Sequence, residues 1–230
     1  MLFRSAAKDL ADIVTGNTQN NQSIDSGFVT EAEYQTAIEQ ALALTNCTIS
    51  GIIKYTNSDQ AEPWLSLDYT YKMATDKKYI GGTDANGTYE YYYSKEEGVD
   101  YTYQKVDGEW AKTVSTKEID YSNAKFAEIL TPFKTVYSSL ILNKDTLFFE
   151  GENVLLENEA QATQESQESD ETQEAPQITL KSLKLKFNDK KLVFVEFSTE
   201  ILTDVENVTC TLYYSLSFSN QGTTNVELPF

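Results

Sequence analysis

Apolar and polar residues alternate with a period of two along most of this chain, a pattern that predicts β-strands with one buried face. The predicted strands lie at 47–55, 65–73, 78–84, 88–94, 99–106, 109–115, 146–156, 183–187, 193–197 and 208–218. Asn86-Gly87 and Asp107-Gly108 each separate two of these runs and are typical of type I′ hairpin turns. Short strands joined by hairpins predict an antiparallel meander.

Helical periodicity replaces the alternation near the N-terminus. Thr30, followed three residues later by Glu33, predicts a capping box, and Val29 with Tyr34 predicts a hydrophobic staple around it. The apolar stripe of this helix consists of Tyr34, Ile38, Ala41 and Leu42. We expect the helix to end near residues 45–46.

A helical insert interrupts the strands in the middle of the chain. Residues 122–130 predict a second helix, and Thr131-Pro132 predicts the N-cap and first residue of a third. The strand at 146–156 is expected to bend at Gly151-Glu152-Asn153. Near the C-terminus, a turn at Asn220-Gln221-Gly222 leads to a closing segment at 226–229.

These elements together predict an α+β fold. A large sheet with one apolar face is not stable alone in water and must cover that face. We therefore expect a curved antiparallel sheet of about 9–11 strands, a half-barrel, with helices packed on its concave face. Residues 1–27 are expected to form a disordered leader or linker, and residues 28–230 a single half-barrel domain.

Charge and composition narrow the function. The 230 residues include 18 Lys+Arg, 36 Asp+Glu and no His, so the net charge is −18. The absence of His excludes Ser-His-Asp triads and imidazole metal ligands, and the acidity disfavours a nucleic-acid partner. Residues 157–177 hold seven of the acids and no basic residue. Such a segment buries too little apolar surface to order itself, and we expect a disordered loop.

Three residue groups have two interpretations each. Cys47 and Cys210 could form a disulfide or remain buried thiols. A tyrosine cluster could bind sugar or peptide, or could hold strand register through cross-strand pairs; it comprises Tyr89, Tyr91, Tyr92, Tyr93, Tyr101 and Tyr103. A lysine stripe could meet anionic lipid or wall polymers, or could neutralise the acidic loop or protect a sheet edge; it comprises Lys181, Lys184, Lys186, Lys190 and Lys191.

Two stretches of the chain suggest a family. Residues 30–51 run from the capped helix into the first strand, and residues 213–229 run from the last strand through a turn to the end. In these stretches, and in the order of elements over 30–229, the chain resembles the LolA-like lipoprotein-carrier superfamily, especially related secreted lipoproteins of Gram-positive bacteria. The ending is similar to that family's final hairpin, and the acidic loop would be an insertion.

The resemblance implies a groove between the concave face and the helices that holds acyl chains or another apolar ligand. The candidate lining residues are Ile53, Tyr55, Leu67, Tyr69, Phe149, Leu185, Leu212 and Tyr214. It also implies a location outside the cytoplasm, at the cell-envelope surface of a Gram-positive bacterium. The signal peptide and lipid-attachment Cys expected there are not seen, so contact with a membrane surface would need an N-terminal anchor missing from this sequence.

We therefore expect a monomeric, non-catalytic (lipo)protein domain that binds a lipid or other apolar small molecule without cofactor or metal. The alternative is a cell-surface interaction protein with a solid core, which would contact a wall polymer or a protein partner. A hydrolase that uses two of the many carboxylates is a third hypothesis, although no spacing singles out such a pair.

Overall fold

The computed structural model describes residues 30–122, 124–156, 178–202 and 208–230. Within these residues, eleven strands form one antiparallel sheet. They are β1 (Cys47–Asn57), β2 (Leu65–Ala74), β3 (Lys77–Asp84), β4 (Gly87–Glu96), β5 (Val99–Val106), β6 (Glu109–Val114), β7 (Ile141–Asn143), β8 (Phe148–Leu156), β9 (Ile178–Asn188), β10 (Lys191–Leu202) and β11 (Thr209–Ser219). The predicted leader at 1–27 and the acidic loop at 157–177 lie outside the described residues.

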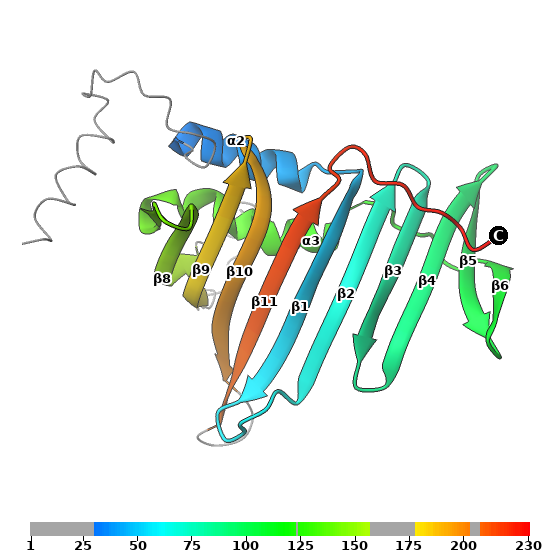
Figure 1. Cartoon of the computed structure of the whole chain (residues 1–230), viewed down its shortest axis with the longest axis horizontal. Helices are drawn as coiled ribbons and strands as arrows, with labels where there is room; N and C mark the ends of the chain where they lie inside the picture. The colour runs from blue at the N-terminus through cyan, green and yellow to red at the C-terminus, as the bar shows by residue number, and fades with distance from the viewer. Residues whose placement is uncertain (1–29, 123, 157–177, 203–207) are drawn as a thin grey trace, which may run out of the picture.

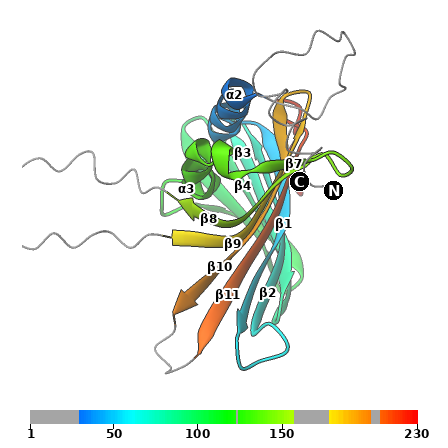
Figure 2. The same cartoon turned by 90° about the vertical axis from the view of Figure 1, so that its left-hand side faces the viewer.

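The strands follow the spatial order β6-β5-β4-β3-β2-β1-β11-β10-β9-β8-β7. The sheet curves without closing, so it is the predicted half-barrel (Figures 1 and 2). Apart from the contact between β1 and β11, each strand pairs with its neighbours in sequence. The predicted meander is therefore correct on both sides of the β1–β11 pair, which we call the seam. The strand β7 was not predicted, because three residues are too short to reveal an alternation.

Side chains of the sheet divide between an inner face, which the helices contact, and an outer face. Ile49 on β1 lies opposite Tyr71 on β2 and Phe218 on β11, and all three are buried on the inner face. Because paired residues share a face, the register assigns every neighbouring position. The concave side is the inner one, and α2 (Glu31–Leu42) and α3 (Ala124–Leu130) lie beside it (Figure 2).

The first helix, α2, has the predicted capping box. The Glu33 backbone N–H donates to the Thr30 hydroxyl, and the Thr30 backbone N–H donates to the Glu33 carboxylate at 3.0 Å. Val29, the other half of the predicted staple, lies outside the described residues. The helix ends at Leu42, earlier than predicted. The chain turns there because the Asn46 side chain bonds both the N–H and the carbonyl of Thr224, which fixes the start of β1.

The helical insert differs from its prediction at Thr131. The helix α3 continues directly into the 3₁₀ helix η1 (Thr131–Thr135), followed by η2 (Tyr137–Ser139). The Thr131 hydroxyl donates back to the carbonyl of Ala127 at 2.7 Å, so it does not cap a new helix. The predicted N-cap is therefore wrong, because the side chain bonds to the preceding turn instead.

The hairpin turns also differ in detail. Asp107 and Gly108 both have positive φ (53° and 85°), as a type I′ turn requires. At the other predicted turn only Gly87 has positive φ (118°), and the central residues are Ala85 and Asn86. The type I′ assignment there is wrong, because Asp84 accepts a bond from the Asn86 N–H and so favours an Asx turn one residue earlier.

The predicted bend in β8 coincides with an interruption of its pairing with β9. Asn153 has a positive φ of 52° and has no partner on β9, while Glu152 and Val154 on either side of it are paired. The register is the same before and after Asn153, so the ladder is interrupted there without an extra residue in either strand.

The predicted closing hairpin is wrong. Both edges of β11 are already occupied, by β1 and β10. The chain does turn at Asn220 as predicted, and the Asn220 carbonyl accepts bonds from the Thr223 N–H and the Thr224 hydroxyl. Residues 220–230 contain no strand and cross the ends of β1 to β4 (Figure 1). They end with Phe230 beside Tyr103 of β5, at 5.6 Å between ring centroids.

Among the described residues, no helix is long and apolar enough to span a bilayer.

Candidate functional site

One half of the inner face is packed solid beneath the helices. Tyr34 and Ile38 of α2, with Leu130 and Phe133 of the insert, are at most 1% exposed. They meet a sheet surface made of Phe149, Leu183, Leu185, Phe187, Leu192, Val195 and Leu216. Two candidate lining residues, Phe149 and Leu185, belong to this core, at 3% and 0% exposure. They are therefore structural, and a ligand could reach them only by displacing the helices.

The other half of the inner face extends beyond the helices. Figure 2 shows α2 and α3 beside the upper part of the sheet, while β10, β11, β1 and β2 continue below them. By register, Ile53 lies opposite Leu67 and Tyr214, and Tyr55 lies opposite Leu65 and Leu212. These six residues are only partly buried. We call them the open apolar half, and it contains five of the eight candidate lining residues.

Trp64 was not predicted as part of this surface, because it precedes β2 and breaks the alternation. Its backbone N–H donates to the carbonyl of Tyr55, and the two rings lie 5.4 Å apart between centroids. The indole is 55% exposed. An exposed aromatic ring next to exposed aliphatic residues enlarges the apolar patch. Ile201, opposite Cys210 on β11, is also 44% exposed.

Tyr69 lies at the border between the two halves of the inner face. Its ring stacks against Phe126 of α3 at 6.2 Å, and its hydroxyl lies over Gly51, where a Cβ would approach it to 3.2 Å. The hydroxyl is buried and has no hydrogen-bond partner in the described part of the chain. Burial, with smaller effects from Tyr214 and Tyr89, raises the pKa of Tyr69, so the phenol stays a hydrogen-bond donor.

Tyr214 continues this border on β11. Its ring stacks on Phe197, with centroids 4.9 Å apart and planes 13° apart. Burial, followed by the effect of Tyr55, raises the pKa of Tyr214 to about 12. The open apolar half therefore carries the uncharged phenol of Tyr214 next to aliphatic side chains at neutral pH.

The two cysteines lie at opposite ends of the sheet's central strands. Cys47 is opposite Met73 at one end of β1, and Cys210 is opposite Asn57 at the other. Both are free, buried thiols, so the thiol interpretation is correct. Burial raises the pKa of Cys47 to about 12, which keeps the thiol protonated and unreactive at neutral pH. In the described residues, no three His, Cys, Asp or Glu side chains gather as metal ligands.

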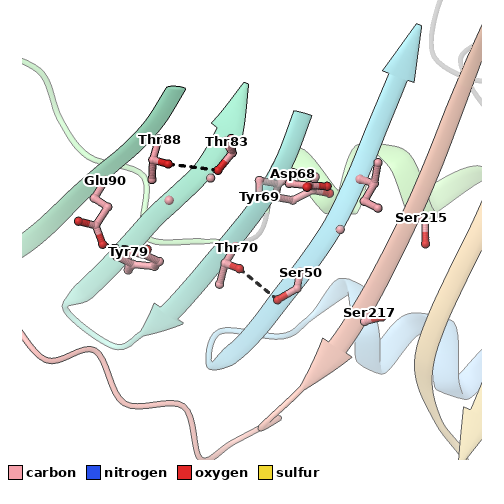
Figure 3. Close-up of a pocket in the computed structure, with 14 residues that line it drawn as sticks. Ser50, Asp68, Tyr69, Thr70, Tyr79, Thr83, Thr88, Glu90, Ser215 and Ser217 are labelled. Carbon is pink, nitrogen blue, oxygen red and sulfur yellow. Dashed lines mark hydrogen bonds between the residues drawn. The ribbon is translucent and has the colours of Figure 1, made fainter. Parts of the chain in front are cut away.

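The outer face carries a shallow, open groove over β11, β1, β2, β3 and β4, lined mainly by hydroxyl-bearing and acidic residues and by glycines (Figure 3), with a volume of about 470 Å³. Ser50 pairs with Thr70 on one side and Ser217 on the other, and Thr70 pairs with Gly81. Sequence reasoning missed this groove. Small residues at the polar positions of these strands were visible, but only the register aligns them into one depression.

The tyrosine cluster lies on both faces of the sheet. Tyr92 pairs with Tyr103, and the Tyr92 ring contacts Tyr79 at 4.8 Å and Trp110 at 5.2 Å on the outer face. Tyr89 and Tyr91 lie on the opposite face, 6.3 Å apart. Within the cluster, cross-strand pairing therefore accounts for Tyr92 and Tyr103.

Tyr103 is fixed by a small polar network. Its hydroxyl donates to the Glu96 carboxylate at 2.9 Å, and Lys112 donates to the same carboxylate at 2.6 Å. Lys112, followed by Ser94 and Tyr103, lowers the pKa of Glu96 to about 2. The charges of Glu96 and Lys112 therefore serve to hold Tyr103 in place at this end of the sheet.

Three of the five lysines of the stripe pair with acids of the folded body. Lys181 lies 3.1 Å from Glu200, Lys184 lies 3.1 Å from Glu196, and Lys190 lies 2.6 Å from Glu33. These pairs neutralise charge locally across β9 and β10 and at α2. Exposed pairs of this kind contribute little to stability.

Comparisons with known proteins give remote structural likeness and no sequence match. No protein-family profile matches the sequence, and a search of curated protein sequences finds no match. Among solved structures, the chain is similar to a DUF1329 family protein from Desulfovibrio piger, at 9% identity and a TM-score of 0.22. The likeness covers 86% of this chain and 94% of that one. A TM-score this low carries no argument about function, and the resemblance to LolA-like carriers stays a hypothesis.

Proposed function

We propose that this protein is a non-catalytic domain that binds a lipid or another apolar ligand against the open apolar half of its inner face. One observation carries the proposal. Six apolar side chains, contiguous by register on the concave side, remain partly exposed beside the exposed ring of Trp64. Contiguous apolar patches on soluble proteins usually mark interaction sites.

The packing explains why a ligand would bind at this end of the sheet. At the other end, α2, α3 and η1 already fill the concavity, so an acyl chain finds no space there. Below the helices, the same curved surface continues without such a cover among the described residues (Figure 2). Burial of a methylene group contributes about 0.8 kcal/mol, so five or six buried methylenes supply about 4–5 kcal/mol.

The tyrosines at the border suit a ligand that is not purely hydrocarbon. Tyr69 and Tyr214 present protonated phenols where the open half meets the core. A polar atom of a lipid could accept a hydrogen bond there, which would satisfy a donor that is buried and unpaired in the described structure. The location that we propose, outside the cytoplasm, rests on the resemblance to secreted carriers.

A titration with oleate below its critical micelle concentration tests this proposal. We expect saturable binding to the full chain. Leu67→Glu places a charge in the open apolar half and is expected to weaken binding at least tenfold, because a contact with the acyl chain is replaced by a carboxylate that must lose water. Isothermal calorimetry measures both affinities.

Ser66→Glu is the matched control, since Ser66 is the preceding residue of β2, is exposed, and lies opposite Lys54 on the outer face. This variant should bind oleate as the native protein does. Equal weakening by both variants would indicate a charge effect on the anionic probe, and uncharged monoolein then replaces oleate in the same comparison. The proposal fails if the native chain binds neither probe, or if Leu67→Glu binds them normally.

A surface-interaction protein with a solid core is the second candidate function, and the packed half beneath the helices fits it equally well. The two candidates are distinguished at the open apolar half, which binds a small apolar molecule in the first candidate and does not in the second.

A further inference from the structure

The outer-face groove has the chemistry of a glycan-binding site, and we propose that it binds a neutral oligosaccharide or polysaccharide. This site is independent of the apolar surface, because the two lie on opposite faces of the same strands.

Two neighbouring rows of side chains form the floor of the groove. In one row, Ser217, Ser50 and Thr70 lie side by side on three adjacent strands, and in the other Asp68 pairs with Thr83. Ser50 and Thr70 share a hydrogen bond of 3.3 Å, as Thr83 and Thr88 share one of 3.4 Å (Figure 3). Neighbouring strands of a sheet lie about 4.8 Å apart, so a row of side chains across five strands extends about 19 Å. An extended polymer could follow it.

The lining of the groove disfavours anionic ligands, although Lys72 and Lys105 lie at its margin. No Lys or Arg is among its fourteen lining residues, and the charged members are Asp68 and Glu90. Glu90 is already engaged, by Lys105 at 3.1 Å and by the Tyr79 hydroxyl at 3.4 Å. Asp68 is exposed in the groove, and among the described residues none donates a hydrogen bond to its carboxylate. A carboxylate is a strong acceptor for ligand hydroxyls, whereas phosphate groups of a membrane or nucleic acid would need cations.

An aromatic ring lies along one side of the groove. The Tyr79 ring crosses the backbone at Gly81, where a Cβ would overlap its hydroxyl and Cζ atoms. Only glycine at position 81 permits this flat position. Beside it, Tyr92 and Trp110 extend the aromatic surface toward β6, and Lys72 lies 5.3 Å from the Tyr79 ring. A ring with one apolar face and a polar rim suits a sugar, which has C–H faces and peripheral hydroxyls.

The backbone disfavours a peptide as the occupant. Extended peptides gain affinity by pairing with an exposed strand edge. The strands β11, β1, β2 and β3 each have a neighbour on both sides, so the floor of the groove offers no free edge. A ligand here must supply its hydrogen bonds to side-chain hydroxyls and carboxylates, as a polyol does.

Saturation-transfer NMR and calorimetry with the full chain test this proposal. The probes are cellohexaose and chitohexaose as neutral glycans, and a heparin hexasaccharide as an anionic one. We expect saturable binding of at least one neutral probe, with the heparin fragment binding more weakly. Asp68→Asn removes the free carboxylate while keeping its size and is expected to weaken binding about tenfold, as the loss of a charge-assisted bond implies.

Asp59→Asn, in the turn between β1 and β2, is the matched control and should bind as the native chain does. Leu67→Glu, on the opposite face, should also leave glycan binding unchanged, which separates this site from the apolar one. The proposal is overturned if neither neutral glycan binds at concentrations up to about 1 mM, if heparin binds most tightly, or if Asp68→Asn and Asp59→Asn behave alike.

Discussion

The Leu185→Ala variant is expected to unfold with a free energy about 2–5 kcal/mol below that of the native protein. Leu185 on β9 is fully buried between the sheet and the helices, so truncation leaves a cavity that the surrounding rings cannot fill. Leu67→Ala, on β2 in the open apolar half, should cost about 1 kcal/mol or less, because this side chain is partly solvated in the folded state. Chemical denaturation of both variants measures the difference.

This pair matters because alternation alone places both leucines on the same inner face. A similar loss for both variants would show that the concavity is packed along its whole length, which would remove the space for a ligand. A much larger loss for Leu185→Ala supports the division of the face into a packed half and an open half.

Truncation of Tyr34 is expected to have an effect of similar size. Its side chain is fully buried, its ring contacts Phe187 at 5.5 Å and Tyr137 at 5.3 Å, and its hydroxyl donates to the carbonyl of Phe133 at 2.6 Å. Tyr34→Ala should therefore lower the free energy of unfolding by about 3–5 kcal/mol, as for other large aromatic truncations.

Tyr34→Phe separates the two contributions of this residue. It keeps the ring but leaves the Phe133 carbonyl without its donor in a buried site, so we expect a loss of about 1–3 kcal/mol. If Tyr34→Phe were as damaging as Tyr34→Ala, the hydrogen bond would dominate. If neither variant were destabilised in denaturant unfolding, α2 would not be anchored to η1 as described.

Most strands could be predicted because the period of two is local and exact, as in β2, where Leu67, Tyr69, Tyr71 and Met73 share a face. The pairing of β1 with β11 was not predicted, because it joins segments that lie far apart in the sequence. The closing hairpin failed for a related reason. The turn after residue 219 was predicted correctly, but only the topology shows that β11 already has two neighbours, so the segment after the turn cannot pair with it.

The candidate site was predicted in part. Alternation correctly placed Ile53, Leu67, Leu212 and Tyr214 on one face. The register of the strands in the structure makes them neighbours. It could not tell how far the helices reach along that face, so Leu185 was grouped with residues that remain partly exposed. The outer groove was missed because its shape depends on Gly81 lying beside Thr70, a relation between two strands.

The most direct test of the central claim uses the two tryptophans of the chain, Trp64 and Trp110, which lie in different regions of the sheet. A dibrominated stearate quenches the fluorescence of an indole that its acyl chain touches. In the Trp110→Phe variant, where Trp64 is the remaining indole, we predict saturable quenching. In the Trp64→Phe variant, Trp110 on the outer side of β6 should keep its fluorescence. Equal quenching of both, quenching of Trp110 alone, or no quenching of Trp64 would contradict the binding of an apolar ligand at the open apolar half.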